Sequence, residues 1–208
     1  GDLLITRSGG GAVTFGEAQT SPVETILSGP VAGAEGAAKV ARELGLDEVV
    51  SADVGGTSFD ICLITEGHPP VMYESKIIDM PVQMPWVDVR SIGTGGGSVA
   101  HVDVGGLLRV GPHSAGADPG PASYGRGGTL PTVTDAALLL GMLGEDELAG
   151  DIRLDGERAR EVFVPLAGKL GLSLEEVAQG VLAISTASMA DAIREITVEQ
   201  GTDPRQAS

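Results

Sequence analysis

An eight-residue segment between two apolar runs most constrains the fold of this chain of 208 residues. Residues 53 to 60 read Asp-Val-Gly-Gly-Thr-Ser-Phe-Asp, with largely apolar runs at 49–52 and 61–64. Short apolar runs that are separated by glycine predict two β-strands joined by a tight turn. The paired glycines permit the backbone conformations that such a turn needs. The segment therefore predicts a β-hairpin with its tip at Gly55 and Gly56.

The polar side chains around this turn are suited to binding a phosphate. Backbone N–H groups of a glycine turn can converge on phosphate oxygens, and Thr57 and Ser58 would add hydroxyl groups. Asp53 and Asp60 flank the turn, where they would hold Mg²⁺ or orient a water molecule. An ordinary hairpin is the alternative, and Asp60 has a second one, in which it caps the turn through its own backbone. The two aspartates and the Thr-Ser pair favour a catalytic and cofactor-binding site.

Composition limits the classes of partner. The chain has 13 Lys and Arg residues against 29 Asp and Glu residues, a formal net charge of −16. This charge repels nucleic acid, and 1 Trp, 2 Tyr and 3 Phe residues offer little surface for base stacking. A nucleotide can still bind through local N–H groups and a divalent cation. We find no signal peptide and no apolar run of about 18 residues, so no membrane association is expected.

The single cysteine, Cys62, lies in an apolar run. One cysteine excludes a disulfide framework, so a reducing cytoplasm is the expected location. A thiol among apolar neighbours is more often a core residue than a nucleophile. We therefore expect Cys62 to pack in the core.

The pattern along the chain predicts an α/β fold in which an α/β part at 1–92 is followed by a glycine-rich insertion at 93–131 and a mainly helical part at 132–208. Capping residues and apolar periodicity predict helices as follows: a short one that starts at Ser21 and stops at 28–30, and longer ones at 31–44, 135–143, 156–170 and 173–198. Besides the hairpin, strands are expected at 1–6, 70–78, 86–92, 99–103 and 107–110.

The glycine-rich insertion holds further candidate site residues. Three consecutive glycines, Gly95, Gly96 and Gly97, expose many N–H groups and would approach a cofactor closely, although a tight turn formed for packing is the alternative. His101 and Asp103 are two residues apart on an expected strand, so their side chains share a face. Together with His113 or Asp118 they would bind a second divalent metal. The alternative is that His101 and Asp103 are hydrogen-bonded to each other.

An ordered series of motifs spans nearly the whole chain: Ser28-Gly29-Pro30, residues 53–60, residues 91–98, Arg109-Val110-Gly111-Pro112, residues 114–121, residues 124–128 and residues 131–135. In this series the chain resembles the central part of hydantoinase A and 5-oxoprolinase family proteins. That resemblance implies an ATP-dependent enzyme that uses Mg²⁺ and acts on cyclic amides. It also implies one ribonuclease-H-like half of the fold shared by actin, hexokinase and heat-shock chaperones, in which the Asp53 to Asp60 hairpin contacts the β and γ phosphates.

The resemblance further implies that this sequence is a fragment. A full family member would carry an earlier domain with its own phosphate hairpin and, beyond residue 205, a glycine-rich loop for adenosine. The expected partners are a small cyclic amide substrate, the remainder of the parent chain and a hydantoinase B type subunit.

The function that the resemblance implies is hydrolysis of a cyclic amide such as hydantoin or 5-oxoproline, in which ATP phosphorylates the amide oxygen. The isolated fragment is expected to be inactive. One alternative within the family is an ATP-dependent ketone carboxylase subunit. Another is a non-catalytic nucleotide-binding or interaction module. A sugar or acyl kinase is a third, and the stretch 114–121 speaks against it.

Overall fold

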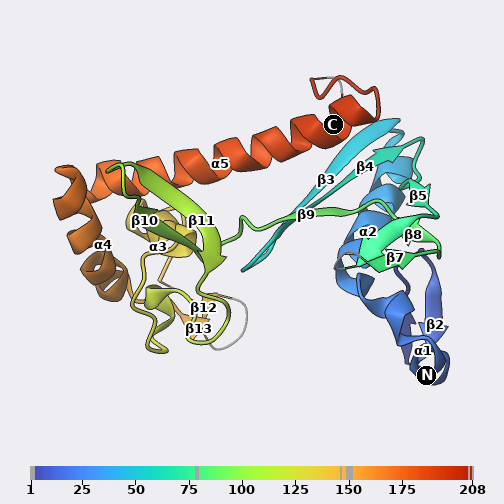
Figure 1. Cartoon of the computed structure of the whole chain (residues 1–208), viewed down its shortest axis with the longest axis horizontal. Coiled ribbons are helices and arrows are strands. Elements are labelled where there is room, and N and C mark those ends of the chain that lie inside the picture. Colours follow the sequence, from blue (N-terminus) through green and yellow to red (C-terminus); the bar gives the residue numbers. More distant parts are fainter. Residues whose placement is uncertain (1–2, 78–79, 146, 149–151, 206, 208) are drawn as a thin grey trace. The chain divides into compact units, whose positions relative to one another are not determined.

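The computed structural model describes residues 3–77, 80–145, 147–148, 152–205 and 207. The chain divides into two compact units. Unit 1 comprises Gly1–Asp53, Asp60–Ser91 and Ala192–Ser208, and unit 2 comprises Val54–Phe59 and Ile92–Asp191. Both units combine helices with strands, which confirms the expected α/β class (Figure 1). None of the helices in the described ranges is long and apolar enough to cross a membrane.

Unit 1 contains most of the strands. Its elements in chain order are β1 (Leu4–Thr6), β2 (Ala12–Thr14), α1 (Phe15–Thr20), the 3₁₀ turn η1 (Pro22–Thr25), α2 (Ser28–Leu44), β3 (Glu48–Val54), β4 (Phe59–Thr65), β5 (Val71–Met72), β6 (Ser75–Ile77), β7 (Met80–Val82), β8 (Trp86–Val87) and β9 (Arg90–Ile92), the hairpin and β9 reaching into unit 2. A three-stranded sheet has the order β3-β4-β9, and three antiparallel pairs join β1 to β2, β5 to β8 and β6 to β7.

The core of unit 1 lies between helix α2 and strand β4. Val31, Ala34 and Ala38 of α2 are buried and recur at helical spacing, so they form one face. This face packs against Cys62 and Ile64 of β4. The helix ends at Gly45, whose φ of 68° is the left-handed conformation of a C-terminal cap.

Two sequence predictions in unit 1 were wrong in detail, and one helix was missed. Helix α2 begins at Ser28 and not at 31. Pro30 is tolerated in the first turn because N–H groups there have no acceptor within the helix, so a proline loses no helical hydrogen bond. The short helix from Ser21 is only the 3₁₀ turn η1. Helix α1 was not anticipated, although Thr14 and Glu17 form a capping box at its start. The expected strands at 1–6 and 70–78 include residues 1, 2 and 78, which lie outside the described residues.

Cys62 is fully buried in this core, as expected. Burial, the largest cause, raises the pKa of the Cys62 thiol to about 12, and the negative charges of Asp88 and Glu35 add to it. The thiol is therefore protonated and shielded at neutral pH.

We expect iodoacetamide to leave Cys62 unmodified in the native protein at neutral pH and to alkylate it quickly in denaturant, as mass spectrometry would show. The pKa of the Cys62 thiol is higher in the folded protein than in the unfolded chain, where it is about 8.5. Below that pH the thiol is protonated in both states, and its full contribution to stability is present. It is lost as the pH rises from there to about 12. Rapid native alkylation would contradict this assignment.

Unit 2 holds the remaining elements: β10 (Ser98–Val102), β11 (Leu108–Ser114), the 3₁₀ turn η2 (Ala122–Tyr124), α3 (Val133–Leu139), β12 (Glu147–Leu148), β13 (Ile152–Arg153), α4 (Gly156–Leu170) and α5 (Leu174–Glu199), of which the last turns belong to unit 1. Strands β10 and β11 form an antiparallel pair close to the expected 99–103 and 107–110, but β10 ends at Val102, before Asp103, and β11 continues to Ser114. The prediction of α4 at 156–170 is confirmed to the residue, and α3 is shorter than the expected 135–143.

The core of unit 2 lies where α3, α4 and α5 meet the β10-β11 pair. Phe163 of α4 is fully buried among Ala100 of β10, Ala136 of α3, and Val177 and Val181 of α5. The first turns of the last helix therefore contribute to the core of unit 2.

Asp135 is a fully buried carboxylate at the start of α3. It accepts from the Thr132 N–H at 3.0 Å and from the Thr132 hydroxyl at 2.8 Å, and the Asp135 N–H donates to Thr132 Oγ1 at 3.3 Å, which completes a capping box. It also accepts from the N–H groups of Ser123 at 2.9 Å and Ala122 at 3.3 Å. Four donors thus replace water around a buried charge, and they join the turn η2 to α3.

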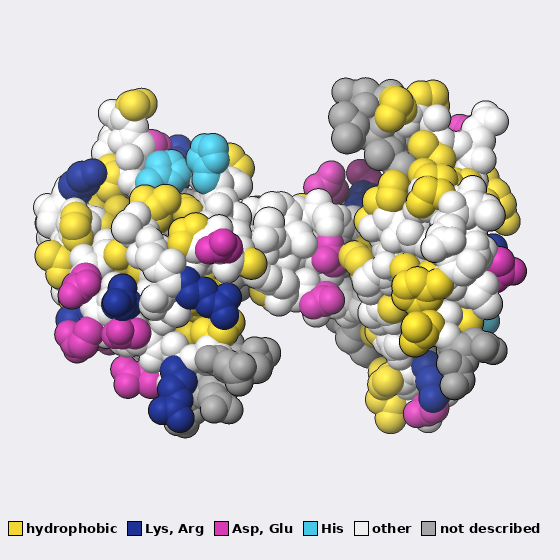
Figure 2. Space-filling view, turned by 90° about the horizontal axis from the view of Figure 1, so that it is seen from below, with side chains coloured by type: hydrophobic (Ala, Val, Ile, Leu, Met, Phe, Trp, Pro, Cys, Tyr) yellow, Lys and Arg dark blue, Asp and Glu magenta, His cyan; other side chains and the backbone are white. Residues whose placement is uncertain are grey.

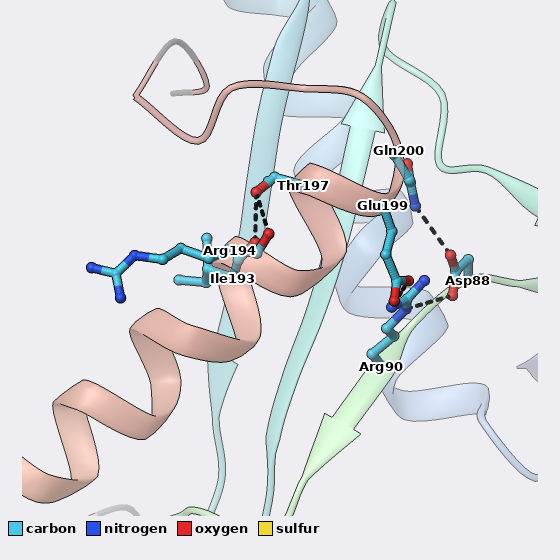
Figure 3. Close-up of polar contacts among 7 residues, drawn as sticks. All are labelled: Asp88, Arg90, Ile193, Arg194, Thr197, Glu199 and Gln200. Carbon is cyan, nitrogen blue, oxygen red and sulfur yellow. Dashed lines mark hydrogen bonds and ion pairs between the residues drawn. The ribbon is translucent and has the colours of Figure 1, made fainter.

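The end of α5 is fixed within unit 1 by polar contacts (Figure 3). Glu199 pairs with Arg90 of β9, whose Nε lies 3.4 Å from Asp88 Oδ1. Gln200 Nε2 donates to Asp88 Oδ2 at 3.1 Å. Residues 192–208, which the sequence groups with the helical part, therefore help to hold β9 beside the hairpin strand β4.

Candidate functional site

The segment 53–60 forms the predicted β-hairpin. Strands β3 and β4 leave residues 55–58 as its tip, which the Gly55 N–H closes by donating to the Ser58 carbonyl at 2.8 Å. Strand β4 is anchored because Phe59 and the apolar run at 61–64 are buried. Gly55, Gly56 and Thr57 at the tip are exposed. A buried strand thus supports an exposed glycine turn.

The tip has backbone donors available for a ligand. Within the described part of the chain, the N–H groups of Gly56 and Thr57 donate to no protein acceptor. The Gly55 N–H, which the sequence also assigned to a cofactor, is used inside the turn. The residues present therefore fit a phosphate through Gly56 and Thr57, and the hydroxyl of Thr57 is exposed beside them.

Asp53 and Asp60 line one pocket of about 260 Å³ in unit 1. The opposite wall is the small-residue face of α2, where a Cβ at Gly33 would lie 3.9 Å from Asp53 Oδ2. Small side chains therefore leave room beside the carboxylates. Asp60 Oδ1 also accepts from the hydroxyl of Ser91 on β9. The structure thus brings the two predicted catalytic residues together and adds Ser91, which sequence reasoning missed because it lies 31 positions away.

The loop with Gly95, Gly96 and Gly97 packs directly on the hairpin tip. The N–H groups of Gly96 and Gly97 donate to the carbonyls of Gly55 and Gly56 at 3.0 and 2.6 Å. The Gly95 N–H donates to Ser98 Oγ at 2.9 Å. All three amides are therefore used inside the protein, which is the geometry of the packing alternative. A cofactor-binding role for these glycines stays a prediction.

The start of α3 fixes this loop from the other side. Thr134 donates to the Gly96 carbonyl twice, from its N–H at 2.8 Å and from its hydroxyl at 2.9 Å. The N-terminal cap of this helix is the neighbouring Thr132. The hairpin tip, the glycine loop and the start of α3 thus form one hydrogen-bonded series in unit 2.

Of the two predicted metal ligands, His101 lies in strand β10 and Asp103 directly follows its end. Asp103 accepts from Arg109 Nε at 2.8 Å and from the N–H groups of Leu107 and Gly105, and these contacts, the Arg109 hydrogen bond first, lower its pKa. The partner of Asp103 is thus Arg109 and not His101, because Arg109 stands opposite His101 in the β10-β11 pair. No group of three or more His, Cys, Asp or Glu side chains in the described ranges could hold a metal ion. A metal role for Asp53, His101 and Asp103 stays a prediction.

Comparisons with known proteins agree along the whole chain. The model of the hydantoinase/oxoprolinase family matches residues 1–208. Caprolactamase subunit alpha of Pseudomonas jessenii is 41% identical over 201 residues, which are 96% of this chain and 29% of the relative. The crystal structure of ATP-dependent caprolactamase from the same organism superposes with a TM-score of 0.79 at 42% identity, covering 89% of this chain and 27% of that one.

The nucleotide-free structure of an acetone carboxylase, from work on ATP-dependent acetone carboxylation, superposes with a TM-score of 0.88 at 30% identity, covering 99% of this chain and 29% of that one. The chain thus spans less than a third of the length of each of these relatives.

Proposed function

Because the chain belongs to the hydantoinase/oxoprolinase family, we propose that it is part of an ATP-dependent enzyme that hydrolyses a cyclic amide. The observation that carries this proposal is the pocket that Asp53 and Asp60 share at the base of an exposed glycine turn. Its α/β architecture would then be one ribonuclease-H-like half of an actin- or hexokinase-type ATPase. The partners would be the rest of the parent chain and a hydantoinase B type subunit.

Each residue of the hairpin has a defined task in this proposal. The N–H groups of Gly56 and Thr57 bind phosphate oxygens, and the hydroxyls of Thr57 and Ser58 add polar contacts. Asp53 binds Mg²⁺ and so fixes the orientation of the phosphates. Asp60, held by Ser91, orients the attacking water. ATP, when bound, would supply the phosphoryl group that makes the amide carbon a better electrophile.

We expect Asp53→Asn to weaken Mg-ATP binding by the intact protein about 10–100-fold, because the variant loses a charged metal ligand. Isothermal titration calorimetry measures this directly. Asp47→Asn is the matched control, since Asp47 is an exposed aspartate close to the start of the same strand. Equal Mg-ATP affinity of Asp53→Asn and wild type would refute the role of Asp53.

A ketone carboxylase subunit is the second candidate, and the TM-score of 0.88 to an acetone carboxylase favours it. Phosphate release with hydantoin, 5-oxoproline or caprolactam, and without bicarbonate, would support the hydrolase. Release only with a ketone plus bicarbonate would support the carboxylase. Nucleotide binding without turnover on any of these would support a non-catalytic module.

A further inference from the structure

A second pocket, of about 530 Å³, lies within unit 2 and shares no residue with the hairpin. Its walls are strand β10, the loop 127–131 and the exposed side of helix α4. The volume is in the range of small-molecule sites. The loop includes Gly127 and Gly128, the end of a sequence motif that the proposed function does not use.

Helix α4 presents an ordered strip of side chains to this pocket. Arg158 comes first and is paired with Asp155; Glu161 follows, then the apolar residues Val162, Pro165 and Leu166, and Lys169 comes last. Glu161 and Lys169 are eight residues apart and share one helix face, and a rise of 1.5 Å per residue separates their Cα atoms by about 12 Å. From Glu161 to Lys169 the strip therefore has a negative end, an apolar middle and a positive end.

The two charges at the ends of the strip are available to a ligand. Arg158, also in the lining, has its Nε 3.2 Å from Asp155 Oδ2. Neither Glu161 nor Lys169 has an ion pair among the described residues, and both are exposed. Pro165 inside the helix has no N–H, so the Glu161 carbonyl lacks its usual helical donor and can accept from a ligand. Figure 2 shows Lys and Arg side chains lying among Asp and Glu on the drawn face of unit 2.

Loop 127–131 adds backbone donors to the opposite wall. In the described part of the chain, the N–H groups of Gly127, Gly128 and Thr129 donate to no protein acceptor. Such N–H groups can donate hydrogen bonds to a carboxylate oxygen of a ligand.

We propose that this pocket binds a linear amino acid whose ammonium and carboxylate groups are separated by a short methylene chain. Glu161 and its carbonyl hold the ammonium end, Val162, Pro165 and Leu166 cover the methylenes, and Lys169 holds the carboxylate. Opening of a lactam ring by water produces a molecule of this class, and this link to catalysis rests on the proposed function. Binding itself requires neither ATP nor the hairpin.

The test is calorimetric titration of the intact protein, without nucleotide, with 6-aminohexanoate, hexanoate and hexylamine. We expect 6-aminohexanoate to bind about tenfold or more tighter than either singly charged compound, because each end adds a charge-assisted hydrogen bond. Lys169→Gln and Glu161→Gln should each remove this advantage. Hexanoate or hexylamine binding as tightly as 6-aminohexanoate, or no binding of any of the three, would overturn the proposal.

Exchanging the charges at positions 161 and 169 distinguishes a loss of ligand recognition from a loss of folding. Combining Glu161→Lys with Lys169→Glu restores both charges in reversed order, so the flexible ligand should bind again where each single charge reversal fails. Lys39→Gln, at an exposed position of helix α2 in unit 1, is the control and should leave affinity unchanged. Loss of affinity in the control, or no recovery in the exchanged variant, would contradict the site. Loss of ATP binding in Asp53→Asn would leave these results untouched, so the two proposals fail separately.

Discussion

Asp135→Ala should lower the free energy of unfolding of unit 2 by about 3–5 kcal/mol, because the variant leaves buried hydrogen-bond donors without an acceptor and without access to water. The carboxylate is fully buried and accepts four hydrogen bonds, from Thr132, Ser123 and Ala122. Asp135→Asn has the same shape but would turn an amide N–H₂ toward a donor, so it should lose most of the same stability.

Urea denaturation followed by far-ultraviolet circular dichroism measures this effect, since unit 2 contains most of the helical residues. Asp155→Ala is the matched control. Asp155 also caps a helix of unit 2, through the N–H groups of Glu157 and Arg158, but its side chain is 46% exposed. The control should lose only about 1 kcal/mol. Equal losses for Asp135→Ala and Asp155→Ala would show that burial adds nothing at Asp135.

The second large effect is expected for Gly95→Ala. A Cβ at Gly95 would lie 2.6 Å from the Gly55 carbonyl oxygen and 2.8 and 2.9 Å from backbone atoms of Thr57 and Ser58. Backbone atoms on both sides cannot rotate away as a side chain could, so the loop and the hairpin tip must separate. We expect a loss of about 2–3 kcal/mol. If the hairpin binds nucleotide, Mg-ATP affinity should fall as well.

Gly93→Ala is the control for this steric argument. Gly93 lies in the same loop, its φ is not in the left-handed region, and a Cβ there would meet nothing within 4 Å. This variant should stay within about 0.5 kcal/mol of wild type. Similar losses for the two alanine variants in urea denaturation would refute the close-contact explanation.

Local signals in the sequence were sufficient for several elements. The apolar runs on either side of Gly55 and Gly56 predicted the hairpin, and the expected range 156–170 matches α4 to the residue. Asp53 and Asp60 could be singled out because two carboxylates beside a glycine turn are a chemical pattern as well as a structural one. Each of these signals lies within a few residues of the feature that it predicts.

Features that depend on distant residues were missed. Ser91 meets Asp60, and Thr134 holds Gly96 from 38 positions away. Nothing in the local pattern distinguishes glycines that expose their amides from glycines that bury them against another turn, so the sequence left both alternatives for Gly95 to Gly97 open. Similarly, the pairing of Asp103 with Arg109 depends on the register of β10 and β11.

The tether at the end of α5 has a consequence for synthesis of the protein. Thr202 donates to Glu48 and Gln200 to Asp88, across 154 and 112 positions of sequence. A ribosome synthesises Glu48 and Asp88 long before Thr202 and Gln200, so these two contacts form only after the residues that follow α5 have been synthesised. Unit 1 of the nascent chain therefore reaches its final contacts only after unit 2 has been synthesised in full.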